Sequence, residues 1–523
     1  MPALQVNKLS YQLDNGVKLF ENISFTLPQG VTGLVGRNGV GKSILASLLA
    51  KDIKPTYGTV SSDMSVHNFN QNNSTLFRED ETISSFLGID KQIAALNRIY
   101  QGICEVSDFE LLADNWQVKG NALKILESLR LPLNLELSCV SLSGGERTKL
   151  SLWKLFQSGA QLLILDEPSN HLDKQGKQWL VKQMKNFTGD VLVVSHDREL
   201  LQEVDAIYEL SSLGLSFFQG AYSEYLSMKQ TNEEALERKL SNLNKQKKNV
   251  LSQAQKSKEK AQKRVSQGKE LRKSGSQAKV LLGCKKNRAE GSISSKVAKT
   301  RAMVLNIGSK QDDLLKEKEN AKLLSLSMHP ERSKKIQQLS IENIELPFGS
   351  KVKLNLKVMS NEKIHLVGEN GSGKSTLMKV ILGELKPING NINSKAKIFY
   401  CDQHFSLLDA QLTMLECMEK NCTDLNETDL RTILAGIGFR GDKVYTQVNQ
   451  LSGGEKMRLM ILIASHQSEL PLLLLDEPDN HLDIESKNVL ANALNEFNGS
   501  LILISHDEYL VRHIEHISKV QLH

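Results

Sequence analysis

The sequence has no continuous apolar run of the roughly 18 to 20 residues that a membrane-spanning helix needs. Its first residues, MPALQVNKLSYQLDNG, lack a basic segment followed by an apolar one, so we expect no secretion signal. The mean hydropathy of -0.30 and the hydrophobic fraction of 40% are typical of a globular chain. We therefore predict a cytoplasmic protein with no membrane span.

Cysteine is scarce and scattered. The six cysteines form no CxxC pair, and Cys417 with Cys422 lacks the further ligands of a zinc site. The pattern therefore predicts reduced thiols rather than disulfides or a structural metal. The six are Cys104, Cys139, Cys284, Cys401, Cys417 and Cys422.

Charge is distributed unevenly along the chain. The formal net charge is +6. Residues 239–301 contain 19 basic and 3 acidic side chains, a local charge of +16, so the remainder carries 6 minus 16, or -10. A basic middle segment thus separates two mildly acidic ends, which suits contact with a phosphate backbone or a solvated charged helix.

One ordered set of motifs occurs twice, which indicates two copies of one domain. The first copy reads GRNGVGKS (36–43), Gln71, LSGGE (142–146), LLILDEP (162–168), NHLD (170–173) and VVSHD (193–197). The second reads GENGSGKS (368–375), Gln403, LSGGE (451–455), LLLLDEP (472–478), NHLD (480–483) and LISHD (503–507).

The spacings agree wherever a rigid site would require it. Asp166 to His196 and Asp476 to His506 both span 30 positions. Lys42 to Gln71 and Lys374 to Gln403 both span 29. The glutamine-to-LSGGE interval is 71 positions in the first copy and 48 in the second, which predicts a 23-residue insertion into the first copy.

Each GxxxxGKS segment follows a strand-like run and is typical of a P-loop, whose backbone N–H groups surround phosphates. The lysines are expected to neutralise phosphates, and the serine hydroxyls to bind Mg²⁺. We predict that ATP binds at Gly36, Asn38, Gly39, Gly41, Lys42 and Ser43, and at Gly368, Asn370, Gly371, Gly373, Lys374, Ser375 and Thr376.

The apolar runs that end in Asp-Glu place two carboxylates at the end of a buried strand. We expect Asp166 and Asp476 to hold the Mg²⁺ shell and Glu167 and Glu477 to activate water. The matched spacing of His196 and His506 predicts contact with the γ-phosphate side, whereas an isolated histidine there would more often be a core residue. Gln71 and Gln403 are predicted to contact Mg²⁺ or water.

The two LSGGE segments predict helix N-termini that can receive an anion. Their central residues are Ser143, Gly144 and Gly145, and Ser452, Gly453 and Gly454. Because each copy already has a P-loop, these termini are expected to meet the nucleotide of the other copy. The aromatic that stacks on adenine stays open: Tyr11 and Phe348 lie upstream of their P-loops, and either can be a ligand contact or an ordinary core residue.

The middle of the chain predicts a long helical hairpin. Residues 229–273 lack proline, and Leu236, Leu243 and Val250 recur every seven residues, although Lys247 and Ser257 interrupt this apolar repeat. Glycines at 275, 283 and 291 predict a break, with a second helix from about 296 to 326. The expected fold is α/β: two P-loop domains, 1–225 and 336–523, joined by a linker at 226–335.

Together these motifs resemble the ATP-binding-cassette (ABC) superfamily, and within it the ABC-F family, through two cassettes in one chain, LSGGE signatures and a repeated DEP-x-NHLD. The resemblance implies two composite sites. One joins the first P-loop, Gln71, Asp166, Glu167 and His196 to Ser452–Gly454. The other joins the second P-loop, Gln403, Asp476, Glu477 and His506 to Ser143–Gly145.

The resemblance also implies an ATP hydrolase that binds the ribosome, its rRNA and tRNA, with the linker hairpin reaching toward the catalytic centre, in translation or in antibiotic protection. The insertion lies where the family carries its arm. The usual Thr of DEPTNHLD is Ser169 in one copy and Asp479 in the other. The sequence ends soon after the second copy, so no further DNA-binding tail and no sequence-specific DNA recognition are expected.

Two other classes remain open at this point. The ATPase subunit of a membrane transporter would carry the same motifs but would not require a basic hairpin. A DNA-maintenance ATPase would use the hairpin, because duplex DNA and ribosomal RNA present similar phosphate charges.

Overall fold

A computed structural model describes every residue except 1–3, 15, 71–76, 79, 104, 114, 171, 212, 274–298, 312–335, 350–351, 370, 403–404, 468–470, 480–481 and 523, and the side chains of 258, 261, 262 and 264–273. Met1–Tyr222 and Leu323–His523 together form one compact unit, and Ser223–Lys322 form a second. We call the two stretches of the larger unit the first half and the second half. The limits 1–225, 226–335 and 336–523 stay a prediction.

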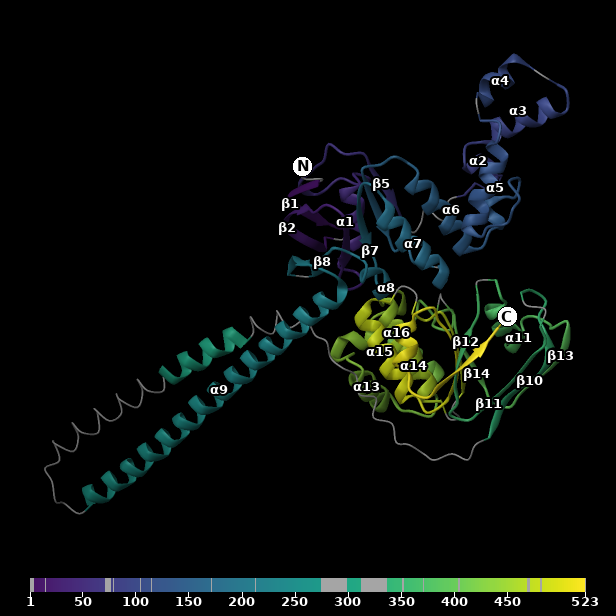
Figure 1. Ribbon diagram of the computed structural model, residues 1–523. Coiled ribbons are helices and arrows are strands. Elements are labelled where there is room, and N and C mark those ends of the chain that lie inside the picture. Colours follow the sequence, from purple (N-terminus) through teal and green to yellow (C-terminus); the bar gives the residue numbers. More distant parts are fainter. Residues whose placement is uncertain are drawn as a thin grey trace. The chain divides into compact units, whose positions relative to one another are not determined.

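The first half contains a six-stranded sheet in the order β5-β6-β7-β3-β8-β9, parallel except for β9 (Figure 1). A separate antiparallel sheet has the order β2-β1-β4. The strands are β1 (Leu4–Gln12), β2 (Lys18–Leu27), β3 (Val31–Val35), β4 (Tyr57–Ser61), β5 (Val66–Phe69), β6 (Leu162–Asp166), β7 (Asp190–Val194), β8 (Ala206–Ser211) and β9 (Gly214–Gln219).

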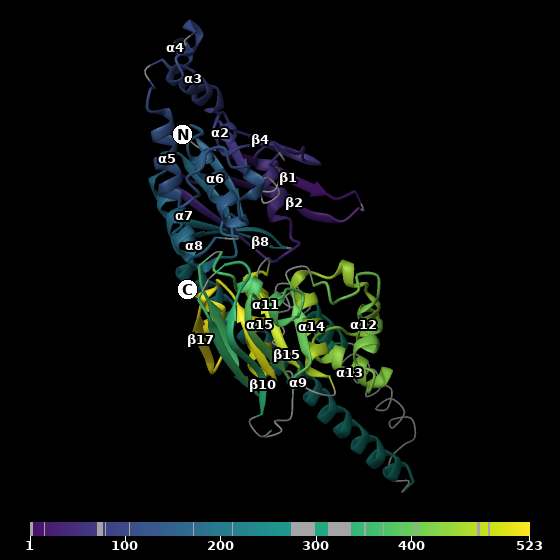
Figure 2. The ribbon, with the colours of Figure 1, turned by 90° about the vertical axis from the view of Figure 1, so that its right-hand side faces the viewer.

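The second half repeats this arrangement with a parallel sheet in the order β14-β15-β16-β12-β17 and an antiparallel sheet in the order β11-β10-β13. Helix α11 packs between the two sheets (Figure 2). The strands are β10 (Gln337–Glu345), β11 (Leu354–Met359), β12 (Lys363–Val367), β13 (Asn389–Ser394), β14 (Ile398–Cys401), β15 (Leu472–Asp476), β16 (Ser500–Ile504) and β17 (Ile517–Gln521).

The sequences of two central strands are typical of parallel sheets. Every residue of β6 (LLILD) and β15 (LLLLD) is buried, as expected when helices cover both faces of a sheet. Each ends in an aspartate where the parallel strands also end, so polar side chains gather at that edge. The predicted α/β class with two copies of one domain is confirmed.

Helices follow the strands in the same order in both halves. In the first half they are α1 (Lys42–Leu49), α2 (Ile83–Phe86), α3 (Asp90–Tyr100), α4 (Val106–Leu112), α5 (Val118–Leu129), α6 (Gly144–Phe156), α7 (Lys174–Asn186) and α8 (Arg198–Leu201). In the second half they are α11 (Lys374–Ile381), α12 (Met414–Asn421), α13 (Glu427–Gly436), α14 (Gly453–Ser465), α15 (Ile484–Glu496) and α16 (Glu508–Arg512). Short 3₁₀ turns occur at Cys139–Ser141, Gly441–Tyr445 and Val448–Gln450.

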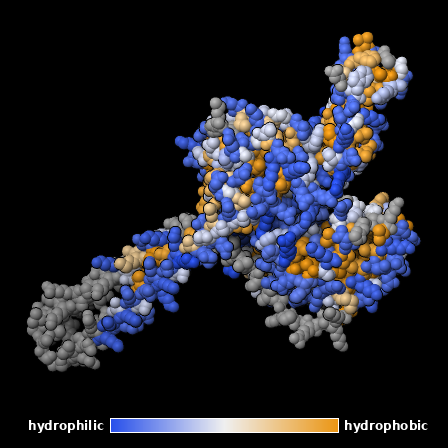
Figure 3. All heavy atoms as spheres, in the orientation of Figure 1, coloured by the Kyte–Doolittle hydropathy of each residue, from blue (hydrophilic) through white to orange (hydrophobic). Residues whose placement is uncertain are grey.

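The predicted insertion forms a pair of helices of its own. Helices α3 and α4 run from Asp90 to Leu112, which is 112 minus 90 plus 1, or 23 residues, and have no counterpart between α12 and α13. Arg98 on α3 forms an ion pair with the fully buried Asp108 on α4, where the Nε–Oδ2 distance is 3.1 Å. Figure 3 shows hydrophobic residues gathered on the helices α3 and α4.

The second unit is built on α9 (Tyr222–Lys273), a helix of 52 residues. At ~1.5 Å per residue it is about 78 Å long. The sequence predicted a helix from residue 229, whereas α9 already begins at Tyr222. Residues 299–311 are also helical, whereas the rest of the predicted second helix and the tip at 274–295 lie outside the described residues.

The return of the hairpin is fixed by side-chain contacts within the second unit. The Gln311 amide donates to Asn244 Oδ1 at 2.7 Å, and Lys247 Nζ donates to Gln311 Oε1 at 3.4 Å. Gln311 is buried. Lys247, which interrupts the predicted apolar repeat, therefore takes part in a polar layer that can fix helix register, as single polar residues do in coiled coils.

The predicted thiols are consistent with this fold. Cys139, Cys401, Cys417 and Cys422 are buried and free, and burial raises the pKa of Cys139 and Cys422 to about 11. Such thiols are protonated and unreactive near neutral pH. Cys104 and Cys284 lie outside the described residues.

The turn after β10 touches the second P-loop and can be tested. A Cβ on Gly349 would lie 2.5 Å from Gly373 Cα, and Gly349 has φ +100°. Gly349→Ala is expected to lower the free energy of unfolding by more than the roughly 1 to 2 kcal/mol of left-handed strain alone. The control Gly383→Ala has φ +78° with no atom within 4 Å, so it should show strain only. Equal shifts of the two variants in chemical denaturation would contradict the proposed contact.

Candidate functional site

Both P-loops join a buried strand to a helix that begins with a left-handed glycine. Gly41 precedes α1 with φ +98°, and Gly373 precedes α11 with φ +95°, and neither helix has a side-chain cap. The first N–H groups of these helices are therefore able to donate hydrogen bonds to phosphate oxygens. The predicted loop residues lie here: Gly36, Asn38, Gly39, Gly41, Lys42, Ser43, Gly368, Gly371, Gly373, Lys374, Ser375 and Thr376. Asn370 lies outside the described residues.

The P-loop lysines are held over their own loops. Lys42 Nζ donates to the carbonyls of Gly36 and Arg37, both at 2.9 Å, and Lys374 Nζ donates to Gly368 at 2.8 Å and Glu369 at 2.9 Å. Burial lowers the pKa of both lysines, while nearby carboxylates oppose the shift. A desolvated cation at this position attracts phosphate strongly.

A carboxylate and a hydroxyl meet in each half where a Mg²⁺ ion would bind. Ser43 lies beside Asp166, and Ser375 lies beside Asp476. Burial raises the pKa of both aspartates. One oxygen of each, Asp166 Oδ1 and Asp476 Oδ1, is buried without a hydrogen-bond partner among the described residues.

This donor set fits Mg²⁺, which usually takes one or two carboxylates and completes its shell with phosphates and water. The described part of the chain contains no group of three or more His, Cys, Asp or Glu residues suited to a metal.

The glutamate after each aspartate occupies a strained backbone position. Glu167 has φ +49° and Glu477 has φ +48°, values that are uncommon for residues other than glycine. The Glu167 N–H donates to Val194 O at 2.8 Å and the Glu477 N–H to Ile504 O at 2.9 Å. These bonds tie each strained turn to the neighbouring strand, and such strain is concentrated at functional sites.

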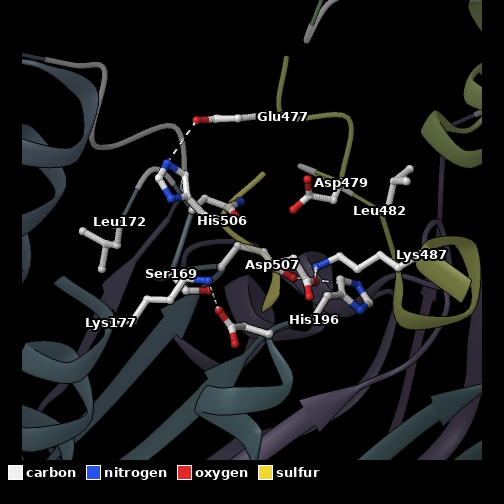
Figure 4. Close-up of a pocket in the computed structure, with 13 residues that line it drawn as sticks. Ser169, Leu172, Lys177, His196, Glu477, Asp479, Leu482, Lys487, His506 and Asp507 are labelled. Carbon is white, nitrogen blue, oxygen red and sulfur yellow. Dashed lines mark hydrogen bonds and ion pairs between the residues drawn. The ribbon is translucent and has the colours of Figure 1, made fainter. Parts of the chain in front are cut away.

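The predicted glutamate and histidine meet in each half. His196 Nε2 lies 3.7 Å from Glu167 Oε1, and His506 Nε2 lies 3.6 Å from Glu477 Oε1, the second pair being drawn in Figure 4. Burial lowers the pKa of His196 far below its usual value and that of His506 to about 4, so both rings are neutral. Burial raises the pKa of Glu167 to about 7, which Lys42 opposes.

Other predicted residues are placed less completely. Gln71 and Gln403 lie outside the described residues. Ser143 caps α6 and Ser452 caps α14, each in a capping box with the signature glutamate at the third helical position, so Gly144, Gly145, Gly453 and Gly454 form the first turns. The pairing of each signature helix with the opposite nucleotide stays a prediction.

Hydrogen bonds across the seam, the contact surface between the two halves, reach the first P-loop. The Asn38 N–H donates to Asp483 Oδ2 at 3.0 Å, while Asp483 Oδ1 accepts from the Ser486 N–H at 2.7 Å and caps α15. Burial would raise the pKa of Asp483, but these hydrogen bonds lower it overall. Beside them Arg37 forms an ion pair with Glu485 at 2.7 Å.

The contacts on the other side of the seam differ. Gln175 Nε2 donates to Glu369 Oε1 at 3.3 Å, next to the second P-loop. Lys174 forms an ion pair with Glu508. The Arg198 guanidinium lies 3.3 Å from the centre of the Tyr509 ring, a cation–π contact.

Sequence reasoning gave no role to several residues at this seam. Asp173 and Asp483 belong to the repeated NHLD motifs, and Lys177 and Lys487 follow each of them by four positions. That repeated spacing was the signal that could have identified them. Tyr400 lies beside Asp476, and nothing in its sequence context indicated this.

The two aromatic candidates for adenine have different surroundings. Tyr11 pairs with Phe20 in the antiparallel sheet and packs against the core of the first half. Phe348 is 69% exposed, and its carbonyl lies 3.0 Å from the position of a Cβ on Gly373. Phe348 therefore lies beside a P-loop with an exposed ring, whereas Tyr11 is partly buried against the core of the first half.

Known proteins match the chain over most of its length. Residues 20–170 and 352–480 match the ABC transporter family. A probable ATP-binding protein, YheS of Escherichia coli CFT073, is 30% identical over 96% of this chain and 76% of its own. The ribosome protection protein VmlR of Bacillus subtilis 168 is 28% identical over 97% and 84%.

Further comparisons agree. ABC transporter F family member 5 of Arabidopsis thaliana is 28% identical over 95% of this chain and 72% of its own. The solved structure of an RNase-L inhibitor matches with a TM-score of 0.51 and 17% identity, over 98% of this chain and 87% of the other, which supports the fold alone. None of the described helices combines the length with the apolar character that a membrane span requires. Two matched cassettes with P-loop, Asp-Glu and histidine in place, and relatives that include an F-family member, show that this chain belongs to the ABC family, in its ABC-F group.

Proposed function

We propose that this protein is an ATP hydrolase that binds two ATP molecules between its cassettes and acts on the ribosome. The observation that carries the first part is the junction of both halves at one P-loop, where Asn38 bonds to Asp483. A loop that already meets the opposite cassette can bind its nucleotide with groups from both sides.

In each proposed site the phosphates lie on the P-loop amides and its lysine. Bound Mg²⁺ would neutralise phosphate charge, held by Ser43 and Asp166 in one site and by Ser375 and Asp476 in the other. Glu167 and Glu477 then take a proton from the attacking water. The pKa of Glu167, raised by burial to about 7, suits a general base near neutral pH.

The histidines have a separate role in this mechanism. Because His196 and His506 are neutral, each can accept or donate one hydrogen bond at the γ-phosphate side without adding a charge. Their distances of 3.7 Å and 3.6 Å from the glutamates allow both groups to approach one water. Phe348 is proposed to stack on adenine in the second site.

The ribosome is the proposed partner. One relative is named a ribosome protection protein. The basic segment 239–301, with its local charge of +16, suits the phosphate backbone of rRNA or tRNA, where released counterions favour binding. We propose that the linker at 226–335 acts there, in translation or in protection from antibiotics, and that the protein works in the cytoplasm.

Replacing Glu167 and Glu477 by Gln tests the chemistry. Loss of both proposed bases is expected to slow ATP turnover about 100-fold or more, because positioned general bases contribute that much, with ATP affinity changed less than about threefold. Phosphate release and equilibrium ATP binding measure the two quantities. Glu127→Gln, an exposed change on α5, is the control. Turnover like that of the wild type would reject the assignment of the two glutamates.

The same double variant tests the partner. With ATP bound and hydrolysis blocked, it is expected to pellet with purified ribosomes through a sucrose cushion and to stay in the supernatant without ATP. A Lys42→Ala, Lys374→Ala variant is the matched control and should not pellet, since its P-loops lack the phosphate-binding cations. If ATP causes no pelleting at moderate salt, the ribosome is the wrong partner, and DNA-stimulated or membrane-associated activity becomes the next measurement.

A further inference from the structure

Two lysines from opposite cassettes extend into one small cavity at the seam (Figure 4). The cavity has a volume of about 40 Å³, room for one or two water molecules. Its charged lining includes Lys177, Lys487, Asp197, Asp507 and Asp479. The proposed hydrolysis mechanism uses none of these side chains.

Each lysine is bound to the aspartate that follows a proposed catalytic histidine. Lys177 Nζ lies 2.6 Å from Asp197 Oδ2, and Lys487 Nζ lies 2.8 Å from Asp507 Oδ2. All four side chains are at most 14% exposed. Removal of one member of such a buried pair would leave an uncompensated charge, so separating lysine from aspartate is costly.

The same aspartates fix the backbone next to the histidines. Asp197 Oδ1 accepts from the Glu199 N–H at 2.9 Å and caps α8, and Asp507 Oδ1 accepts from the Leu510 N–H at 3.0 Å and caps α16. One carboxylate oxygen thus orders the histidine loop, while the other is bound to a lysine on α7 or α15.

The lysine helices also reach the opposite nucleotide site. Asp483 caps α15 and accepts from the Asn38 N–H of the first P-loop, and Lys487 lies one turn further along α15. Lys487 then binds Asp507, next to His506, which faces Glu477 in the second site. A continuous series of contacts therefore runs from the first P-loop to the second histidine.

A reciprocal series begins at the second P-loop. Asp173 caps α7 and contributes a favourable charge to Lys374, and Lys177 on α7 binds Asp197, next to His196. Burial would lower the pKa of both lysines, Lys177 and Lys487, but carboxylates from both cassettes raise it, Asp507 acting on Lys177 and Asp197 on Lys487. Both lysines are therefore charged, and each is attracted by an aspartate across the seam, although Lys487 repels Lys177.

We propose that Lys177 and Lys487 are positioning residues that couple the two ATP sites, each transmitting closure at one P-loop to the histidine loop of the other site. This inference rests on the proposed binding of two ATP molecules. It assigns neither lysine to the nucleotide itself.

Binding of the analogue adenylyl imidodiphosphate with Mg²⁺, followed by calorimetry, tests the coupling without hydrolysis. In the wild type the second molecule is expected to bind about 10-fold more tightly than the first, within the usual range of allosteric coupling. In Lys177→Met, Lys487→Met the two constants should agree within about twofold, with the first changed less than about threefold. Cooperativity equal to that of the wild type, or no cooperativity in the wild type, would overturn the proposal.

Two further variants separate charge from folding. Asp197→Asn, Asp507→Asn keeps a residue that caps helices as well as aspartate does, so it should lose the coupling while retaining the folded structure. Lys177→Arg, Lys487→Arg retains the charge and should retain most of the coupling. Loss in the arginine variant together with full coupling in the asparagine variant would show that packing, not charge, connects the sites. ATP turnover of the wild type, measured separately, reports on the proposed function alone.

The two lysines are not equivalent, because Asp479 occupies the position that Ser169 holds in the first cassette. Asp479 is buried, has one oxygen without a hydrogen-bond partner among the described residues, and acts on Lys487. Ser169 instead contacts Ser195 at 3.5 Å. Lys487 therefore balances three carboxylates, Asp479, Asp507 and Asp197, whereas Lys177 balances Asp197 and Asp507.

This asymmetry predicts an unequal cost of removing each lysine. Lys487→Met should lower the melting temperature about 2 °C or more beyond Lys177→Met, because it leaves an additional buried carboxylate uncompensated. In an Asp479→Ser background, which reproduces the serine of the first cassette, the difference should disappear. Differential scanning fluorimetry measures all four variants. A difference that persists in the Asp479→Ser background would show that Asp479 does not share Lys487.

Discussion

The parallel pairing of β6 with β7, and of β15 with β16, sets the geometry on which each nucleotide site depends. Leu165 pairs with Val193 and Asp166 with Val194, and the second half repeats this with Leu475, Leu503, Asp476 and Ile504. All the residues of β6 and β15 before the terminal aspartate are apolar and buried, so a slip that carried Asp166 or Asp476 further into the sheet would bury a carboxylate among apolar residues, which is costly. The carboxylates at the end of β6 or β15 therefore lie next to the histidine that follows the neighbouring strand, β7 or β16.

The features that depend on this local order could be predicted from the sequence. The repeated motifs and their matched spacings predicted that the P-loop, the Asp-Glu pair and the histidine belong to one site. The structure brings these three features together within each half. The 23-residue insertion was found by subtraction, but its folding into α3 and α4 was not, because Arg98 and Asp108 carry no pattern that reveals their pairing. Gln71 and Gln403 lie outside the described residues, so their role stays a prediction.

Contacts between elements that are distant in the sequence could not be predicted in the same way. Asp483 belongs to a recognisable motif, yet its bond to Asn38 joins residues 445 positions apart. Lys247 was an interruption in the apolar repeat of the hairpin, and its contact with Gln311 depends on the return of a second helix. Periodicity describes one element at a time, whereas these contacts depend on how two elements are placed.

The unequal contacts at the seam have a consequence for how such a chain can arise and persist. Lys174 meets Glu508, and at the position of Glu508 the first cassette carries Arg198. A symmetric pair of two first cassettes would thus bring Lys174 against Arg198, two like charges. Substitutions of this kind disfavour the pairing of two first cassettes, and one polypeptide that carries both halves supplies them in equal amounts.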